Sequence, residues 1–129
     1  MNLNILVTGS AYSSQSAYSA LTFCHAALTQ GHRITQVFFY RDAVSQASRL
    51  TVPLDDEFNC IDEWIAFAKG NDVPLVACVS AAERRGILNA EQADEFAKDA
   101  DNVHPIFQIE GLGVLHDASL SSDRTVTFK

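Results

Sequence analysis

Residues 75–79, Leu75-Val76-Ala77-Cys78-Val79, form an uninterrupted apolar run. Such a run, without polar alternation, is typical of a strand that is covered on both faces, as strands of parallel sheets are. Pro74 precedes the run, and the polar segment that begins at Ser80 follows it, so the strand has clear limits. The segment therefore predicts a central strand of a parallel sheet with helices on both sides.

Working outward from this strand, strand-like and helical patterns alternate along the chain. Further strands are predicted at 3–7, 34–39, 106–109 and 125–128, with helical patterns between them. This order predicts an α/β fold: a three-layer, doubly wound, mostly parallel five-stranded sheet. A flavodoxin-like strand order, 2-1-3-4-5, is expected. In that order the first and third strands are neighbours, so the loop 9–15 would face the end of the third strand.

Several residues mark where the helices begin and end. We expect Gly31 to end the first helix and Gly70 the second, with the acids of Asp55–Glu57 at the start of the second. Ser80 is expected to cap a short helix that ends near Gly86. Asn89 and Gln92 resemble a capping box for the next helix.

The second helix carries an unusually wide apolar face around Trp64. A helix at the surface of a protein needs a narrower apolar stripe than this one has. Either the core surrounds this face or a partner covers it.

Length and charge restrict the classes of protein that fit. The 129 residues are 47% hydrophobic and 19% charged, which suits one globular domain spanning 1–129. Nine Lys and Arg against sixteen Asp and Glu give 9 − 16 = −7, so the basic footprint of a nucleic-acid-binding protein is absent. No signal-peptide pattern and no membrane-span pattern occurs, and we expect a cytoplasmic protein without membrane contact.

The three cysteines differ in their predicted positions. Cys24 and Cys60 lie on apolar helix stripes, where a free thiol packs as a small hydrophobe. Cys78 ends the predicted central strand, just before a helix start whose free amides stabilise an anion. Arg84 and Arg85 add a local positive charge, and together these features favour a reactive thiolate. Position alone leaves a second interpretation open, a buried strand cysteine with two solvated arginines.

Other candidate sites have weaker patterns. The loop Thr8–Ser14 is rich in hydroxyls but lacks G-x-G-x-x-G and a Walker lysine, so it is a flavin-phosphate loop or simply a capped turn. Gly111-Leu112-Gly113 is interpreted as a turn. The four histidines and three cysteines show no metal-ligand spacing. No G-x-S-x-G elbow supports a serine triad. We therefore expect no cofactor and no metal.

Four segments carry a resemblance to a known family. They are Val37-Phe38-Phe39-Tyr40-Arg41-Asp42-Ala43-Val44, Cys78-Val79-Ser80-Ala81-Ala82-Glu83-Arg84-Arg85-Gly86, Gly111-Leu112-Gly113 and Ser122-Asp123-Arg124-Thr125-Val126-Thr127-Phe128. The chain resembles the DsrE/TusD family of sulfur-relay proteins over nearly its whole length. The block that begins at Cys78 is the most specific part, because it contains the reactive cysteine of the family. Ser80 stands where alanine is usual.

The resemblance implies a persulfide carrier, a sulfurtransferase subunit in which Cys78 is catalytic and no cofactor takes part. In one branch of the family a TusA-like donor supplies the sulfur and a TusE-like acceptor receives it, for 2-thiolation of the tRNA wobble uridine. That branch works in a heterohexamer with TusB-like and TusC-like subunits. In the other branch the partners are DsrF-like and DsrH-like subunits with a DsrC-like acceptor, and the process is sulfur oxidation. Asn102-Val103-His104-Pro105 is closer to the second branch.

The hydroxyl-rich loop keeps a different hypothesis open, namely a non-catalytic scaffold or small-ligand-binding module of flavodoxin-like shape.

Overall fold

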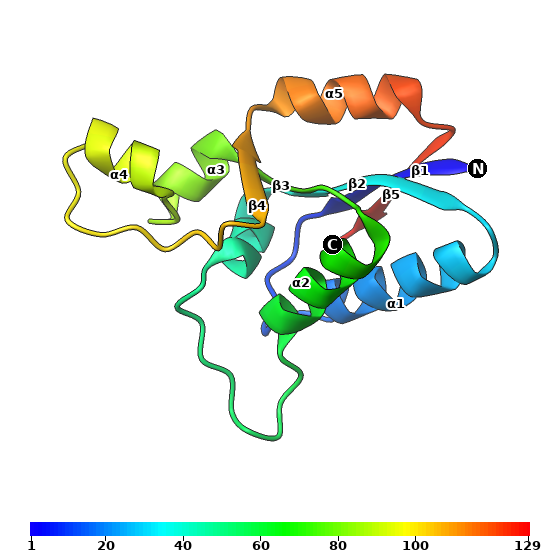
Figure 1. Cartoon of the computed structure of the whole chain (residues 1–129), viewed down its shortest axis with the longest axis horizontal. Coiled ribbons are helices and arrows are strands. Elements are labelled where there is room, and N and C mark those ends of the chain that lie inside the picture. The colour runs from blue at the N-terminus through cyan, green and yellow to red at the C-terminus, as the bar shows by residue number, and fades with distance from the viewer.

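The computed structural model describes residues 1–129 and contains five strands, five α-helices and one 3-10 helix, η1. The strands are β1 (Asn2–Val7), β2 (Arg33–Phe39), β3 (Leu75–Cys78), β4 (Phe107–Glu110) and β5 (Arg124–Phe128). The helices are α1 (Ser16–Thr29), η1 (Arg41–Ala47), α2 (Cys60–Asn71), α3 (Val79–Arg84), α4 (Ala90–Glu95) and α5 (Leu112–Ser121). Figure 1 shows their arrangement.

The five strands form one sheet in the order β4-β3-β2-β1-β5, and every pairing is parallel. The predicted α/β class with a parallel five-stranded sheet is confirmed, but the predicted order 2-1-3-4-5 is wrong. It would have left β2 at an edge, whereas β2 lies at the centre, with its last four residues buried. Strands β4 and β5 form the edges of the sheet. Exposed and partly buried residues alternate along them, as expected for strands that other elements cover on one face only.

The helices cover both faces of this sheet. Figure 1 shows α1 and α2 on one side and α5 on the other. From β1 through β2 and β3 to β4 the chain moves one strand at a time in one direction, and from β4 it returns to β5 at the opposite edge. Since crossovers between parallel strands are right-handed, the return helix α5 must lie on the face opposite α1 and α2. The result is a three-layer fold.

The core lies mainly between the sheet and the α1–α2 layer. Phe39 of β2 meets Trp64 of α2 edge to face at 5.2 Å between ring centroids, and Trp64 meets Phe67 at 6.0 Å. Trp64 has no exposed surface. Trp64, Phe67 and Ala68 on the wide apolar face of α2 are therefore covered by the protein's own core, whereas Ile65 on the same helix stays partly exposed.

The end of α1 agrees with the sequence prediction. Gly31 has φ 84°, its N–H donates to the Leu28 carbonyl, and the N–H of His32 donates to the Ala27 carbonyl. These are the two bonds of a Schellman motif, which needs a left-handed residue after the helix. The capping box of Asn89 and Gln92 is also present, at the start of α4.

The limits of α2 differ from the prediction. Asp55–Glu57 lie before the helix, and Asn59 caps it by accepting a hydrogen bond from the N–H of Asp62. Gly70 is inside α2, and Asp72 with φ 52° takes the left-handed position after it. A cap whose side chain accepts an amide hydrogen bond fixes a helix start more firmly than acids near the first turn.

No helix in the structure is long and apolar enough to span a lipid bilayer.

Candidate active site at the end of β3

Cys78 is the last residue of β3 and the N-cap residue of α3. Its side chain is 1% exposed, and its Sγ lies 3.6 Å from the Oγ of Ser80, an exposed residue. The expected strand-end position is confirmed, and the thiol at that position is buried. Ser80 is not the cap: it is the second residue of α3 and lies against the sulfur.

The sheet register shows which way Cys78 points. Phe39 pairs with Ala77 and contacts Trp64, so Ala77 faces the α1–α2 layer. Because successive side chains of a strand alternate between faces, Cys78 points to the side of α5. Its register partner on β4 is Glu110. The thiol therefore has a carboxylate residue beside it on the next strand.

Cys78 lies at a topological switch point despite the changed strand order. After β3 the chain enters α3 and then reaches β4, the next strand in the same direction as the earlier crossovers. After β4 the chain enters α5, which lies on the opposite face of the sheet. Ligands of open α/β sheets bind where two neighbouring strands diverge in this way. The switch point here lies between β3 and β4, where Cys78 and Glu110 are paired.

The loop 9–15 does not meet Cys78 as expected, because β2 separates β1 from β3. The hydroxyls of Tyr12 and Ser14 in this loop bond within the protein instead. The Oγ of Ser14 donates to the Ser10 carbonyl, and the Tyr12 hydroxyl donates to the Phe58 carbonyl. A Cβ on Gly9 would come within 2.3 Å of the Ser16 Oγ, so the turn is tightly closed. The turn is therefore closed at Gly9 and Ser14, while Ser10, Tyr12 and Ser13 line a hollow of about 250 Å³ beside it.

The charge around α3 is less positive than the two arginines suggest. Nε of Arg85 forms an ion pair with Asp42 at 2.9 Å, and its NH1 donates to the Ala81 carbonyl. Arg84 is exposed, in the last turn of α3. The local positive charge expected from Arg84 and Arg85 is therefore reduced, because Asp42 offsets the charge of Arg85.

The other two cysteines are buried in the core, which confirms their predicted packing role. Burial raises the pKa of the Cys24 thiol from 9.0 to about 12. Burial also raises the pKa of Cys60 to about 12, against a smaller lowering by its hydrogen bond with Trp64. Thiols with such pKa values stay protonated at neutral pH and are poor nucleophiles.

Two structural features, at Gln46 and Arg41, have no signal in the sequence. Gln46 is 1% exposed, and its Oε1 accepts from Nε1 of Trp64 at 2.7 Å and from Sγ of Cys60 at 3.3 Å. Arg41 has φ 54°, a left-handed backbone that a non-glycine residue adopts rarely, at the junction of β2 and η1. A buried glutamine and a strained arginine depend on contacts between distant segments, which no local pattern encodes.

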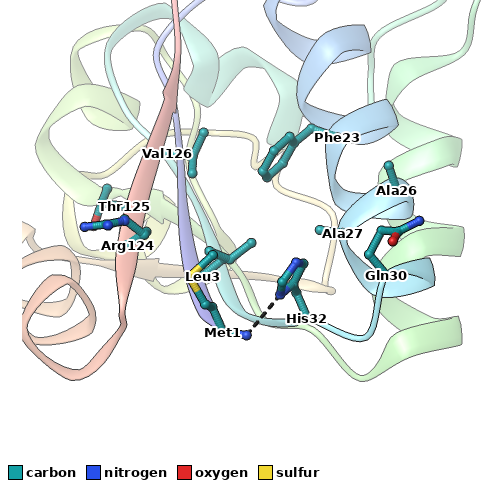
Figure 2. A pocket seen from close by; sticks show the side chains of 10 residues that line it. All are labelled: Met1, Leu3, Phe23, Ala26, Ala27, Gln30, His32, Arg124, Thr125 and Val126. Atoms are coloured by element: carbon teal, nitrogen blue, oxygen red, sulfur yellow. Dashed lines mark hydrogen bonds between the residues drawn. The ribbon is translucent and has the colours of Figure 1, made fainter.

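A cavity of about 380 Å³ lies at the other end of the sheet (Figure 2). Leu3, Phe23 and Val126 line it, and the amino group of Met1 lies 3.0 Å from Nδ1 of His32 at its edge. Leu3 and Arg124 belong to the amino-terminal halves of β1 and β5, whereas Cys78 ends β3. This cavity is therefore separate from the site at Cys78.

Comparison with known proteins adds the following findings. A family model described as the DsrE/DsrF-like family matches residues 1–128. "Sulfurtransferase TusD" of Serratia proteamaculans is 44% identical over 124 residues, 96% of each chain. "Sulfurtransferase TusD" of Salmonella arizonae is 44% identical over 128 residues, 99% of this chain and all of the relative. The solved structure of the ychN protein from E. coli superposes with a TM-score of 0.75 at 22% identity, over 98% of both chains.

Proposed function

The chain belongs to the DsrE/DsrF-like family and is a sulfurtransferase, and from this premise we propose that it is a sulfur-relay subunit in which Cys78 carries sulfur as a persulfide. The 44% identity to proteins named sulfurtransferase TusD extends over nearly the whole chain and supports the activity. The position of Cys78 at the switch point between β3 and β4 is the observation that supports its role.

The transfer needs only a thiolate and a persulfide. The Cys78 thiolate attacks the terminal sulfur of a donor cysteine persulfide, the S–S bond of the donor breaks, and the donor leaves as a thiolate. The new Cys78 persulfide then gives its terminal sulfur to an acceptor thiolate by the same exchange. Sulfur atoms, charge and electrons balance in each step, and no metal or further oxidant takes part.

Among the three cysteines, Cys78 is best placed for this exchange. Cys24 and Cys60 lie inside the core with pKa values near 12. Cys78 lies beneath the exposed Ser80. Because Cys78 is 1% exposed, the start of α3 has to move when a partner docks.

The proposed partners follow from the family. A TusA-like carrier donates the sulfur and a TusE-like carrier accepts it, toward 2-thiolation of the tRNA wobble uridine in the cytoplasm. The subunit works in a heterohexamer with TusB-like and TusC-like subunits. The net charge of −7 supports contact with proteins rather than with RNA directly. Helix α5 buries none of its residues and exposes Leu112 and Leu120, which supports a subunit contact there.

A test of the carrier role uses the purified chain with a cysteine desulfurase, cysteine and the donor carrier. We expect the intact mass to increase by one sulfur atom, and reductant to remove it. Cys78→Ser should abolish the gain, while Cys24→Ser is the matched control and should keep it. A gain that persists in Cys78→Ser, or no gain in the native chain, contradicts the proposal.

The sulfur-oxidation branch is the alternative within the same activity, with DsrF-like and DsrH-like subunits and a DsrC-like acceptor. The resemblance of Asn102-Val103-His104-Pro105 to that branch favours it. The two branches differ in the carrier that accepts the sulfur. The loaded chain is mixed with a TusE-like and with a DsrC-like carrier, and the intact mass of each carrier is then measured. The carrier that gains the sulfur distinguishes the two branches.

A further inference from the structure

A groove of about 370 Å³ opens on the α5-facing side of the sheet, at the carboxyl ends of β1, β2 and β5. It is lined by Leu6, Thr8, Tyr40, Arg41, Thr127 and Lys129. We call it the Arg41 groove. Its lining contains two cationic side chains and no Asp or Glu, in a chain that has sixteen acids against nine basic residues.

The register of the sheet places this groove next to Cys78. Phe38 of β2 pairs with Leu6 on one side and with Val76 on the other, so these three side chains share the α5 face. Two residues further along β2 and β3, the same face carries Tyr40 and Cys78. Tyr40 keeps an extended backbone, and its N–H donates to the Val7 carbonyl at 2.9 Å, which continues the pairing of β2 with β1. Tyr40 therefore lies between the groove and Cys78.

Arg41 adds positive charge beside Tyr40. Its guanidinium carbon lies 5.9 Å from the centre of the Tyr40 ring, within the range of a cation–π contact. The left-handed backbone of Arg41 turns the chain from β2 into η1 directly after Tyr40. Unlike Arg85, Arg41 has no ion pair in the structure. Its charge is available to a ligand.

We propose that the Arg41 groove receives the persulfide-bearing segment of the partner protein and that Arg41 binds the anionic sulfur during transfer. This inference rests on the proposed function of Cys78. Cys78 Sγ attacks the terminal sulfur, the S–S bond of the partner breaks, and the negative charge moves from Cys78 to the partner's sulfur, which leaves as a thiolate. The negative charge thus ends on the leaving sulfur of the partner, and the guanidinium of Arg41, which follows Tyr40 in the chain, stabilises that anion.

Two alkylating reagents of nearly equal size test this charge without any partner. Iodoacetate is an anion and iodoacetamide is neutral, and both modify the Cys78 thiolate when the start of α3 opens transiently in the isolated chain. We expect Arg41→Asn to lower the rate with iodoacetate about three- to tenfold and to leave the rate with iodoacetamide unchanged, as the loss of one nearby charge predicts. Asparagine tolerates the left-handed backbone, so the variant keeps the turn. Arg41→Lys should restore most of the iodoacetate rate.

Arg33→Asn is the matched control, because it removes an exposed arginine from the opposite end of β2. It should leave both rates as they are. An equal fall of both rates in Arg41→Asn, an unchanged ratio, or failure of either reagent to reach Cys78 in the native chain overturns the inference.

A second measurement follows the transfer of sulfur to Cys78. Single-turnover transfer from glutathione persulfide to Cys78 should be about three- to tenfold slower in Arg41→Asn than in Arg33→Asn. If native protein takes up no sulfur while the alkylation ratio still depends on Arg41, the proposed function fails and the charged groove stands. If native protein loads normally and neither measurement depends on Arg41, the groove inference alone fails.

Discussion

At the scale of single residues, Gln46 connects three segments that are distant in the sequence. Its Nε2 donates to the Gly9 carbonyl at 3.0 Å, and its Oε1 accepts from Trp64 and Cys60. A buried donor that loses its acceptor keeps the full cost of its desolvation. Gln46 therefore fixes the loop after β1 and the start of α2 against η1, on the side of the sheet opposite Cys78.

We predict that Gln46→Ala lowers the free energy of unfolding by about 3 kcal/mol, because it leaves the Trp64 N–H buried without a partner. Urea unfolding followed by tryptophan fluorescence measures this change. Gln108→Ala, an exposed position on β4, is the control and should change stability by less than about 0.5 kcal/mol. A loss below 1 kcal/mol in Gln46→Ala would contradict this role.

At the scale of elements, two glycines near helix ends differ in the backbone conformation that they adopt. Gly31 is left-handed, whereas Gly70 lies within α2 with open space around its Cα. Gly31→Ala should cost about 1 kcal/mol, because an L-residue pays to adopt that conformation. Gly70→Ala should instead stabilise the protein by about 0.5 kcal/mol, since alanine favours helices. Thermal unfolding of both variants shows whether each one is destabilised or stabilised. Equal changes in melting temperature would contradict the placement of Gly31 after α1 and of Gly70 inside α2.

The elements themselves were largely predictable from the sequence, because their signals are local. The apolar run 75–78, the left-handed Gly31 and the capping box at Asn89 all depend on neighbouring residues. Strand order is not local. The apolar triplet at the end of β2 and the polar alternation of β4 and β5 indicate which strands are central, but they do not say which strands pair.

The same distinction applies to the candidate site. Its central residue, Cys78, could be found from its position at the end of an apolar run. Its neighbours could not, because Tyr40 and Glu110 come beside it only through the register of β2, β3 and β4. The pairing of Arg85 with Asp42 depends in the same way on the packing of α3 against η1.

At the scale of the whole molecule, the two sides of the sheet differ in how they are packed. The α1–α2 side is apolar, whereas α5 meets a polar layer in which the Asn4 amide donates to the Ser119 and Thr125 hydroxyls. The Oδ1 of Asn4 and the Nε2 of Gln36, on paired residues of β1 and β2, are buried without partners. The buried polar side chains of the sheet, Asn4 and Gln36, thus lie on the face to which Cys78 points.

The two core cysteines make the stability of the whole chain sensitive to alkaline pH. In the unfolded chain these thiols ionise near pH 9, whereas in the folded chain their pKa is about 12. Unfolding therefore releases protons between these values, and stability falls as pH rises above 9. Each cysteine should remove about 1.4 kcal/mol by pH 10.

Urea unfolding at pH 8 and pH 10 measures this loss. The native chain should lose about 3 kcal/mol more between the two pH values than the variant Cys24→Ala with Cys60→Ala, because only the native chain has both thiols to ionise. Parallel losses in the two proteins would show that the buried thiols do not cause the pH dependence.

The most direct test of the account is the position of transferred sulfur in the chain. The protein is loaded from cysteine labelled with radioactive sulfur by a desulfurase and a donor carrier, trapped by alkylation without reduction, and digested. We predict one labelled peptide, the one that contains Cys78, with the label released by reductant. Label on the peptides of Cys24 or Cys60, or on none, would contradict the claim that this strand-end thiol carries the sulfur.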